Sequence, residues 1–446
     1  MSDEPPQRTW RARLAALRLD LTPLRVSRDY RNLTFSGAIT MLGSYITFIA
    51  VPIQMKELTG SPFAVGAVAL AEFVPMVLCG LYGGALADAV DRRTMVIWSE
   101  AGLMVLTGAL LLNALLPTPQ VWVLYVVAAG VAACDGLQRP SLDGLVPRYL
   151  PHGMMASAGA LNSLRWNFGA IVGPAVGGLL VAYSGVQLAY FLDVLTFGLS
   201  LLLLLRLSPA PPRGEAQPAS LRSIAVGLRY AVRRPDLAGT YLIDMVAMAM
   251  AMVSALYPFM ADRVRAPWAL GLMYSAGAVG ALLAALTSGW TQRVHRHGMA
   301  VIVSAAAWGA VVAVAGRTTN VWLLLACLVV AGSMDMVSGL FRSVIWNQSI
   351  PDGLRGRLAG IELLSYSSGP LIGNARAGFV AEWRGVPFAV ISGGIACVTG
   401  VVALAAALPA FRRYDARTDE HVLAEAARRK AQEEQRSTTE GSPAPG

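Results

Sequence analysis

The stretch GAIVGPAVGG (Gly169–Gly178) lies inside an apolar segment, Met155–Tyr183, that is long enough to cross a lipid bilayer. Three of its glycines are spaced four residues apart, so they share one face of a helix and allow a neighbouring helix to approach backbone to backbone. Pro174 removes one amide donor and bends the helix. The stretch therefore predicts a kinked helix with a smooth packing groove in mid-membrane, and the simpler interpretation is an ordinary seam of small residues.

The composition is that of a membrane protein. Hydrophobic residues make up 55% of the chain and charged residues 14%, whereas a soluble domain has about 25% charged residues. The four cysteines lie in apolar segments and form no CxxC pair, which excludes a disulfide framework or a cysteine metal site. A nucleotide-binding P-loop pattern is also absent from the sequence. We therefore expect no enzyme, no cofactor, no metal and no nucleic-acid partner.

Twelve continuous apolar segments follow one another, each near the ~20 residues that a spanning helix needs. Their continuity and their lack of period-two alternation exclude strands, so the predicted class is all-α and integral to the membrane. The segments are Phe35–Met55, Phe63–Leu86, Thr94–Leu116, Val121–Leu145, Met155–Tyr183, Ala189–Leu207, Leu237–Ala261, Leu270–Trp290, Ala300–Gly316, Val321–Ile345, Leu358–Ala381 and Phe388–Leu408.

A polar, Pro-rich linker divides these segments into six plus six. The predicted organisation is a basic N-terminal segment (1–30), a six-helix bundle (31–207), the linker (208–236), a second six-helix bundle (237–410) and a charged tail (411–446). The 36 Lys and Arg residues divide unequally between the two sides of such a topology, with 27 on the side of the termini and linker, 5 on the other side and the rest inside spans. By the positive-inside rule, both termini are expected in the cytoplasm.

The two halves repeat weakly. A shift of 200 residues places Asp135 on Asp335 and the glycines at 169, 173 and 178 on those at 369, 373 and 378. A shift of 204 places Arg92 on Arg296. Parallel repeats of six spans are a transporter architecture, with the substrate site between the repeats near mid-membrane.

The loop after the second segment reads GGALADAVDRR (Gly83–Arg93). It resembles the signature GxxxD(R/K)xGR(R/K) of the major facilitator superfamily at Gly84, Asp88, Arg92 and Arg93, and it departs from that signature at Ala89 and Asp91. An aspartate at a helix end can accept hydrogen bonds from a helix N-terminus or an arginine of the other half. The resemblance implies an inner gate that includes Asp91; the alternative is a plain charged turn.

The opening stretch is similar to the antiporter motif GxxxGPxxGG of exporters in the same superfamily. Its matching residues are Gly169, Gly173, Pro174, Gly177 and Gly178. Segments at 29–31, 58–62, 84–93 and 139–147 resemble the transmembrane secretion effector branch, of the enterobactin-exporter and macrolide-efflux type. This resemblance covers roughly Tyr30–Leu408. It implies the major facilitator fold and export of small molecules driven by the proton gradient, and it does not identify the molecule.

Charged residues inside spans are costly and indicate function or structural ion pairs. The candidates for coupling or substrate contact are Glu72, Asp244, Glu362, Asp135, Arg139, Arg165, Asp335 and Arg342. Asp135 and Arg139 share a helix face, as do Asp335 and Arg342, so each pair is expected to interact. The RxxQG pattern that places a proton-linked arginine in the fourth span is missing around Arg139. Asp193 is expected near a membrane interface.

Aromatic and amide side chains near these charges are candidates for a pocket lining. They are Tyr45, Asn162, Trp166, Asn167, Tyr257, Tyr274, Trp346, Asn347 and Tyr366. The sequence thus predicts a monomeric antiporter in the inner or plasma membrane, which exchanges protons for a drug, siderophore or secondary metabolite and contacts membrane lipids. The alternatives are an importer or lipid flippase of the same fold, or a non-transporting receptor or scaffold.

Overall fold

The computed structural model describes residues 20–212, 229–230, 233–350, 352–425 and 427–428, which are helical and contain no β-strand. The α-helices are α2 (Thr22–Val26), α3 (Arg28–Thr59), α4 (Pro62–Ala89), α5 (Arg92–Ala114), α6 (Val121–Tyr149), α7 (Met155–Leu204), α9 (Pro235–Ala251), α10 (Tyr257–Arg263), α11 (Leu270–Leu286), α12 (His297–Arg317), α13 (Val321–Ser349), α14 (Asp352–Arg384), α15 (Val386–Ala407) and α16 (Pro409–Arg412). Short 3-10 helices are η1 (His152–Met154), η2 (Ser254–Leu256), η3 (Pro267–Ala269) and η4 (Ser288–Arg293).

Local chemistry fixes several helix ends. The Ser61 side chain accepts a hydrogen bond from the Ala64 amide at the start of α4, and Pro62 occupies the first turn, where its missing amide costs nothing. Asn320 caps α13 in the same way. Gly60 ends α3 with a φ of 65°, a left-handed conformation that suits a residue without a side chain. These polar turns mark where the apolar helices leave the membrane.

Ten helical segments in the described part of the chain are long and apolar enough to cross a membrane. One of them, His152–Leu204, has 53 residues, more than twice the roughly 20 that a single crossing needs. Gly185 interrupts it with a φ of 77° and a ψ of 171°. The all-helical class is therefore confirmed, while the count of twelve stays a prediction.

The seventh apolar segment is not the continuous helix that the sequence predicts. The chain leaves the helix at Met252 and Val253, between α9 and η2. The Asn374 side chain of α14 accepts hydrogen bonds from Ser254 Oγ at 3.1 Å and from the Ala255 amide at 3.0 Å. A break in an apolar environment exposes backbone groups, and this distant amide satisfies one of them. The predicted span itself is confirmed, because Pro235–Arg263 is long and apolar enough to cross a membrane. Hydropathy alone reveals neither the break nor the amide that satisfies it.

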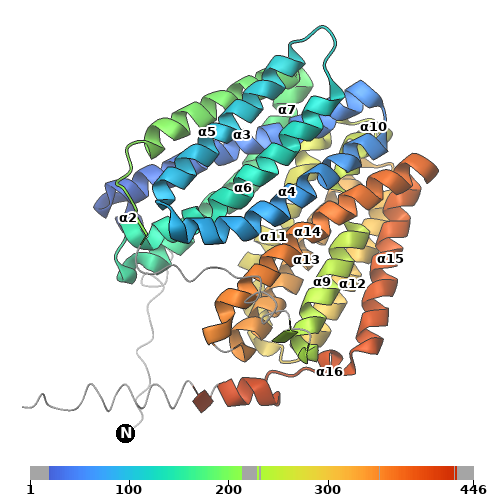
Figure 1. Ribbon diagram of the computed structural model, residues 1–446. Helices are drawn as coiled ribbons and strands as arrows, with labels where there is room; N and C mark the ends of the chain where they lie inside the picture. Colours follow the sequence, from blue (N-terminus) through green and yellow to red (C-terminus); the bar gives the residue numbers. More distant parts are fainter. Residues whose placement is uncertain (1–19, 213–228, 231–232, 351, 426, 429–446) are drawn as a thin grey trace, which may run out of the picture.

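The helices form two groups that lie side by side. Figure 1 shows α3–α7 in blue to green toward the upper left and α9–α15 in yellow-green to red toward the lower right. Each group has its own buried apolar cluster, and each cluster takes one residue from the other group, Ile49 in the second and Ala255 in the first. α2, the start of α3, the η1 turn between α6 and α7 and the segment after α7 lie together at one end of the first group. There, Ser208 N donates to Asp29 and the Tyr30 hydroxyl donates to Ala158 O.

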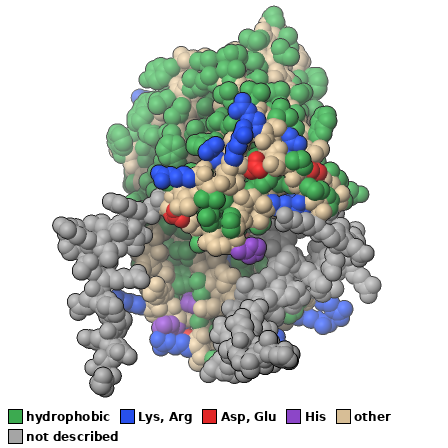
Figure 2. All heavy atoms as spheres, turned by 90° about the vertical axis from the view of Figure 1, so that its left-hand side faces the viewer, with side chains coloured by type: hydrophobic (Ala, Val, Ile, Leu, Met, Phe, Trp, Pro, Cys, Tyr) green, Lys and Arg blue, Asp and Glu red, His purple; other side chains and the backbone are tan. Residues whose placement is uncertain are grey.

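Figure 2 views the molecule from that side, and Lys and Arg side chains are more numerous than acidic ones on the visible face. Apolar side chains cover the upper flank of the same view. The expected orientation, with the Lys- and Arg-rich side in the cytoplasm, stays a prediction.

The two groups meet through glycine backbones. A Cβ placed on Gly178 of α7 would lie 2.5 Å from the Cα of Gly271 in α11. A Cβ on Gly66 of α4 would lie 2.8 Å from the Cα of Gly378 in α14. Both distances are shorter than side chains tolerate, so these crossings require glycine. They join the groups near the start of α4 and the start of α11.

Polar contacts reinforce the same end. Ser61 Oγ donates to the Glu382 carboxylate at 2.7 Å, and the Phe63 amide donates to the same carboxylate at 3.2 Å. Lys56 at the end of α3 pairs with Asp262 of α10 and donates to Pro258 O at 2.8 Å. The groups are thus held together at this end by three kinds of contact. These are the glycine backbone crossings, the Lys56–Asp262 ion pair and the Glu382 carboxylate, which accepts hydrogen bonds at the start of α4.

The other glycines of the opening stretch pack within the first group. A Cβ on Gly169 would lie 2.8 Å from the Met41 side chain of α3, and a Cβ on Gly173 would lie 2.7 Å from Tyr45. Gly177 faces the backbone of Ile46, with 2.9 Å to its Cα. The face shared by these glycines is therefore the contact surface with α3, as the spacing predicts.

The second group repeats this packing. Gly369 and Gly373 of α14 face Met248 and Met252, with 2.7 Å from a Cβ to each methionine Cβ. α14 thus packs against α9 as α7 packs against α3. The glycines that coincide under a shift of 200 residues therefore make equivalent contacts in the two groups.

The Gly178–Gly271 crossing yields the first prediction. In a background without the native cysteines, the pair Ser61→Cys and Glu382→Cys reports whether the joined end stays closed. Adding Gly178→Leu pushes α7 and α11 apart, so we expect the yield of cross-linked protein to fall several-fold. Gly198→Leu is the matched control on α7, because a Cβ there meets nothing within 4 Å. Equal cross-linking in both variants would contradict the packing argument.

Candidate functional site

The turn between α4 and α5 is bound to its own group. The Asp91 carboxylate caps α5 by accepting from the amides of Arg93 at 2.8 Å and Thr94 at 3.2 Å, and it also accepts from the Ala210 amide at 3.0 Å. The Arg93 guanidinium donates to Leu205 O at 2.8 Å. These bonds tie the start of α5 to the segment that follows α7.

The remaining residues of this motif differ in their surroundings. The Arg92 guanidinium lies over Gly144 of α6 and donates to Ala87 O at 3.1 Å. A Cβ on Gly84 would meet nothing within 4 Å, whereas one on Gly83 would lie 2.6 Å from Gly136 O. The close approach of α4 and α6 therefore falls one residue before the motif glycine. The side chain of Asp88 lies outside the described residues.

The second group contains a buried ion pair whose acidic member differs from the one expected from the sequence. Arg342 of α13 pairs with Asp244 of α9, with 2.6 Å between Nη1 and Oδ2. Their side chains are 10% and 4% exposed. Asp335 lies within electrostatic range of both and is half-buried. The expected partner of Arg342 was Asp335, seven residues earlier on the same helix, and the structure shows a direct contact with the neighbouring helix instead.

The first group holds a series of carboxyl groups. Glu72 of α4 lies within electrostatic range of Asp135 of α6. Asp135 in turn lies within range of Arg139 and of Glu100 of α5, and Glu100 within range of Asp193 of α7. These acidic groups form a series across α4–α7, in which Glu100 and Asp193 are buried, Glu72 is half-buried and Asp135 is exposed.

Hydroxyl and amide groups hold two of these carboxyls. Thr40 of α3 donates to Glu100, and Gln138 of α6 donates to its other oxygen at 2.8 Å. Thr47 of α3 donates to Asp193, which is 1% exposed. Asp193 is thus buried against α3, and its expected place near a membrane interface stays a prediction.

The sequence reasoning missed Glu100 and Asn374. Glu100 lies early in the third apolar segment. An acidic residue inside an apolar span indicates a functional or paired group, so the sequence does contain a signal for Glu100. Asn374 carries no such signal, because its role depends on the break after α9. Glu362, a predicted coupling candidate, has its side chain outside the described residues.

Arg165 of α7 lies against α3. Its guanidinium fills the space above Gly37 and donates to Asn162 Oδ1 at 2.8 Å. It borders a groove of about 290 Å³ between α3 and α7, lined mainly by apolar side chains that include Phe35 and Phe168. The groove therefore combines an apolar wall with one cation.

Four aromatic rings connect the two groups. Tyr45 and Phe48 of α3 pack edge to face, with 6.4 Å between ring centroids, and Phe48 packs on Tyr274 of α11 at 5.5 Å. Tyr257 of α10 packs on Tyr274 at 4.9 Å. Trp346, also proposed as pocket lining, stacks on Tyr241 and donates to Thr240. The predicted aromatic residues thus separate into a cluster between the groups and one inside the second group.

A metal centre is not formed by the described residues, since no three His, Cys, Asp or Glu side chains among them are placed to hold an ion. A buried ion pair, a row of carboxyls and apolar-aromatic surfaces between two membrane-spanning groups fit binding and movement of a solute. The sequence profile of the transmembrane secretion effector family matches residues 19–437. The chain belongs to this family. It is a branch of the major facilitator superfamily, whose members are membrane transporters and not enzymes.

Among curated relatives, this transmembrane secretion effector is similar to the enterobactin exporter EntS of Shigella boydii serotype 18, with 28% identity over 362 residues. The match covers 81% of this chain and 87% of that protein. The enterobactin exporter of Escherichia coli O1:K1 matches with the same identity and coverage. The chain is therefore a multi-pass membrane protein related to bacterial exporters.

Solved structures share its fold. A POT family transporter in complex with 5-aminolevulinic acid aligns with a TM-score of 0.69 at 12% identity, over 86% of this chain and 97% of that one. A bacterial homologue of the iron transporter ferroportin in an inward-facing state aligns with a TM-score of 0.67 at 16% identity, over 86% and 98% of the two chains. At these identities the likeness concerns the fold alone.

The Asp244–Arg342 pair yields the second prediction. Asp244→Asn leaves a buried guanidinium without its counter-charge, which costs about 3–5 kcal/mol when a buried pair is broken. We expect a clear fall in the thermal unfolding temperature of the purified protein, and a partial recovery when Arg342→Gln is added. Asp335→Asn is the control, with a smaller effect expected. If Asp335→Asn lowers the unfolding temperature as much as Asp244→Asn does, Asp244 is not the main partner of Arg342.

Proposed function

We propose that this transmembrane secretion effector exports a small organic molecule in exchange for protons by alternating access. The observation that carries the proposal is the joining of two helix groups at one end through equivalent glycine crossings, with carboxyl groups buried between helices of the first group. The relatives named as enterobactin exporters support export as the direction.

The proposed topology has twelve crossings in two sets of six. His152–Leu204 supplies two crossings, because it is long enough and is interrupted at Gly185. α14, with 33 residues, supplies one more. The matching contacts of the Gly169 and Gly369 regions support two structurally related halves.

In the proposed orientation, the basic end with both termini faces the cytoplasm and the joined end faces outward across the inner membrane. The rule that cytoplasmic loops carry an excess of Lys and Arg supports it. The glycine crossings then close the outer side, so the structure corresponds to an inward-facing state. We propose that the protein acts as a monomer surrounded by lipid, with Asp91, Arg92 and Arg93 at the inner gate.

The proposed coupling site lies in the first group. Glu72 of α4 and Glu100 of α5 lie within electrostatic range of Asp135, and Asp193 of α7 lies within range of Glu100. A carboxyl held by a hydroxyl group can gain a proton without leaving a buried cation unpaired, whereas Asp244 cannot because Arg342 depends on it. Proton uptake is therefore assigned to the first group, and Asp244 to structural support.

The groove beside Arg165 is the proposed contact for substrate. Its apolar wall suits an aromatic or lipophilic surface, and its guanidinium suits an anionic or polar group. A siderophore with aromatic and acidic groups fits this combination. Enterobactin, named for the relatives, is the first compound to test.

The third prediction concerns coupling, tested with everted membrane vesicles. We expect enterobactin to accumulate when the vesicles are energised, and a protonophore to abolish that accumulation. Asp193→Asn and Glu72→Gln should each reduce it to near the protonophore-treated level, because a neutral amide cannot carry the proton. Glu57→Gln is the control, since Glu57 is an exposed carboxyl at the end of α3.

The double variant Asp244→Asn with Arg342→Gln separates structure from coupling. If it recovers its unfolding temperature and still accumulates substrate under the gradient, Asp244 is a structural residue as proposed. Accumulation that persists in the presence of protonophore would refute proton coupling. Loss of transport in the double variant with normal stability would place the coupling at Asp244.

A further inference from the structure

A basic cavity lies at the end of the second group where α9 begins and α13 ends, away from the proposed transport path. It has a volume of about 520 Å³. Its charged and titratable lining residues are Arg229, Arg233, Arg234, His421, Glu425 and Arg428. We call this cavity the Arg234 pocket. Its wall comes from three separate parts of the chain, namely the segment before α9, the end of α13 and the tail after α16.

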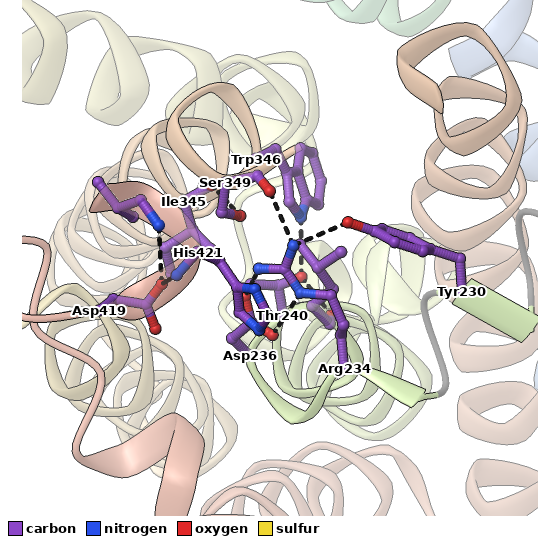
Figure 3. Close-up of polar contacts among 11 residues, drawn as sticks. Tyr230, Arg234, Asp236, Thr240, Ile345, Trp346, Ser349, Asp419 and His421 are labelled. Carbon is purple, nitrogen blue, oxygen red and sulfur yellow. Dashed lines mark hydrogen bonds and ion pairs between the residues drawn. The ribbon is translucent and has the colours of Figure 1, made fainter. Parts of the chain in front are cut away.

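Arg234 forms the floor of the pocket and is fixed by its neighbours, as Figure 3 shows. Its guanidinium is paired with Asp236 through two bonds and donates to Ser349 O at 2.7 Å and to the Tyr230 hydroxyl at 2.9 Å. Burial alone disfavours the charged form, but these hydrogen bonds and the Asp236 charge hold the pKa of Arg234 above its usual value. The floor is therefore a rigid, charged element.

The tail that closes the pocket is firmly docked. Phe411 is completely buried between Gly239 of α9 and Gly298 of α12, where a Cβ would overlap it. The Ala416 amide donates to His295 O at 3.0 Å. Asp419 then accepts from the amides of His421 and Val422 at 3.0 and 3.1 Å, which starts the turn that carries His421 to the pocket (Figure 3).

The charges of the wall are mostly positive. Arg229 and Arg233 are exposed at the mouth, and the Arg428 side chain is 67% exposed, 4.0 Å from the buried Glu425. Guanidinium groups that converge on a cavity match the geometry of phosphate oxygens and bind them through paired, charge-assisted hydrogen bonds. The single acidic side chain in the wall leaves an excess of positive charge.

The position of the pocket defines the kind of ligand. α9 begins at Pro235 and α13 ends at Ser349, so the pocket lies where two spanning helices leave the apolar layer. Lipid headgroups occupy this depth, and basic pockets between helices on the cytoplasmic side attract anionic ones. A phosphorylated solute presents the same chemical group from the aqueous side.

We propose that the Arg234 pocket binds a phosphate group, which bridges the segment before α9 and the tail after α16. The bound group contacts Arg229, Arg233 and Arg428 at the mouth, while Arg234 keeps the floor in place. The ligand is distinct from the exported molecule, since the pocket lies outside the groove between α3 and α7. Its source is either an anionic lipid headgroup or a soluble phosphate compound.

The fourth prediction tests the pocket in purified full-length protein. The variant Arg229→Gln with Arg233→Gln removes two exposed charges from the mouth and leaves Arg234 intact. The control Arg412→Gln with Arg413→Gln removes two exposed charges from α16 and its end, outside the pocket. Thermal unfolding is followed in detergent during titration with phosphatidylglycerol, with phosphatidylcholine and with inorganic pyrophosphate.

We expect one anionic probe to stabilise wild type and the control alike, and its apparent affinity for the mouth variant to fall about tenfold, because two charge-assisted contacts are lost. A selective effect of phosphatidylglycerol identifies a lipid headgroup, and one of pyrophosphate identifies a soluble phosphate. Equal responses of the mouth variant and the control, or no response of wild type to either anionic probe, would overturn the proposal. Equal unfolding temperatures of wild type, the mouth variant and the control in the absence of ligand exclude a folding defect.

Discussion

Backbone contact between glycines is the constraint on which the rest of the structure depends. Gly178 meets Gly271 and Gly66 meets Gly378 at distances that leave no room for a Cβ. Only at such a separation can Ser61 reach Glu382 and Lys56 reach Asp262 from the other group. α7 and α14 each pack along a helix of their own group and cross a helix of the other. Any movement of one group relative to the other must therefore change the contacts that α7 and α14 make.

The electrostatics of the two groups are unlike. In the second, Asp244 and Arg342 neutralise each other, and separating them would leave a charge in an apolar interior. In the first, hydroxyl and amide donors from α3 and α6 hold Glu100 and Asp193. Such a carboxyl can change its protonation state with little rearrangement of its neighbours. The acidic cluster therefore suits a changing charge, and the ion pair suits a fixed one.

The features that the sequence predicts correctly are those set by one segment at a time. Apolar length gives the helices, and four-residue spacing gives the face of α7 that meets α3. Side-chain contacts between different helices are not predicted in this way, because they depend on which helices become neighbours. Arg342 has an acidic candidate on its own helix and another on α9, and spacing cannot choose between them. The break after Ala251 is equally hidden, since the Asn374 amide that satisfies it lies on α14.

The same distinction explains why the internal repeat is clear in the glycines and faint elsewhere. A backbone crossing below van der Waals distance for a Cβ admits one residue type, so Gly178 and Gly378 make equivalent crossings with a helix of the other group. A buried charge needs only a partner, and α6 and α13 satisfy that need differently around Asp135 and Asp335. In the proposed transport cycle, two groups that rock against each other must match in shape at their contacts. Under the same proposal only one of them needs a group that takes up a proton, so their chemistry is free to diverge.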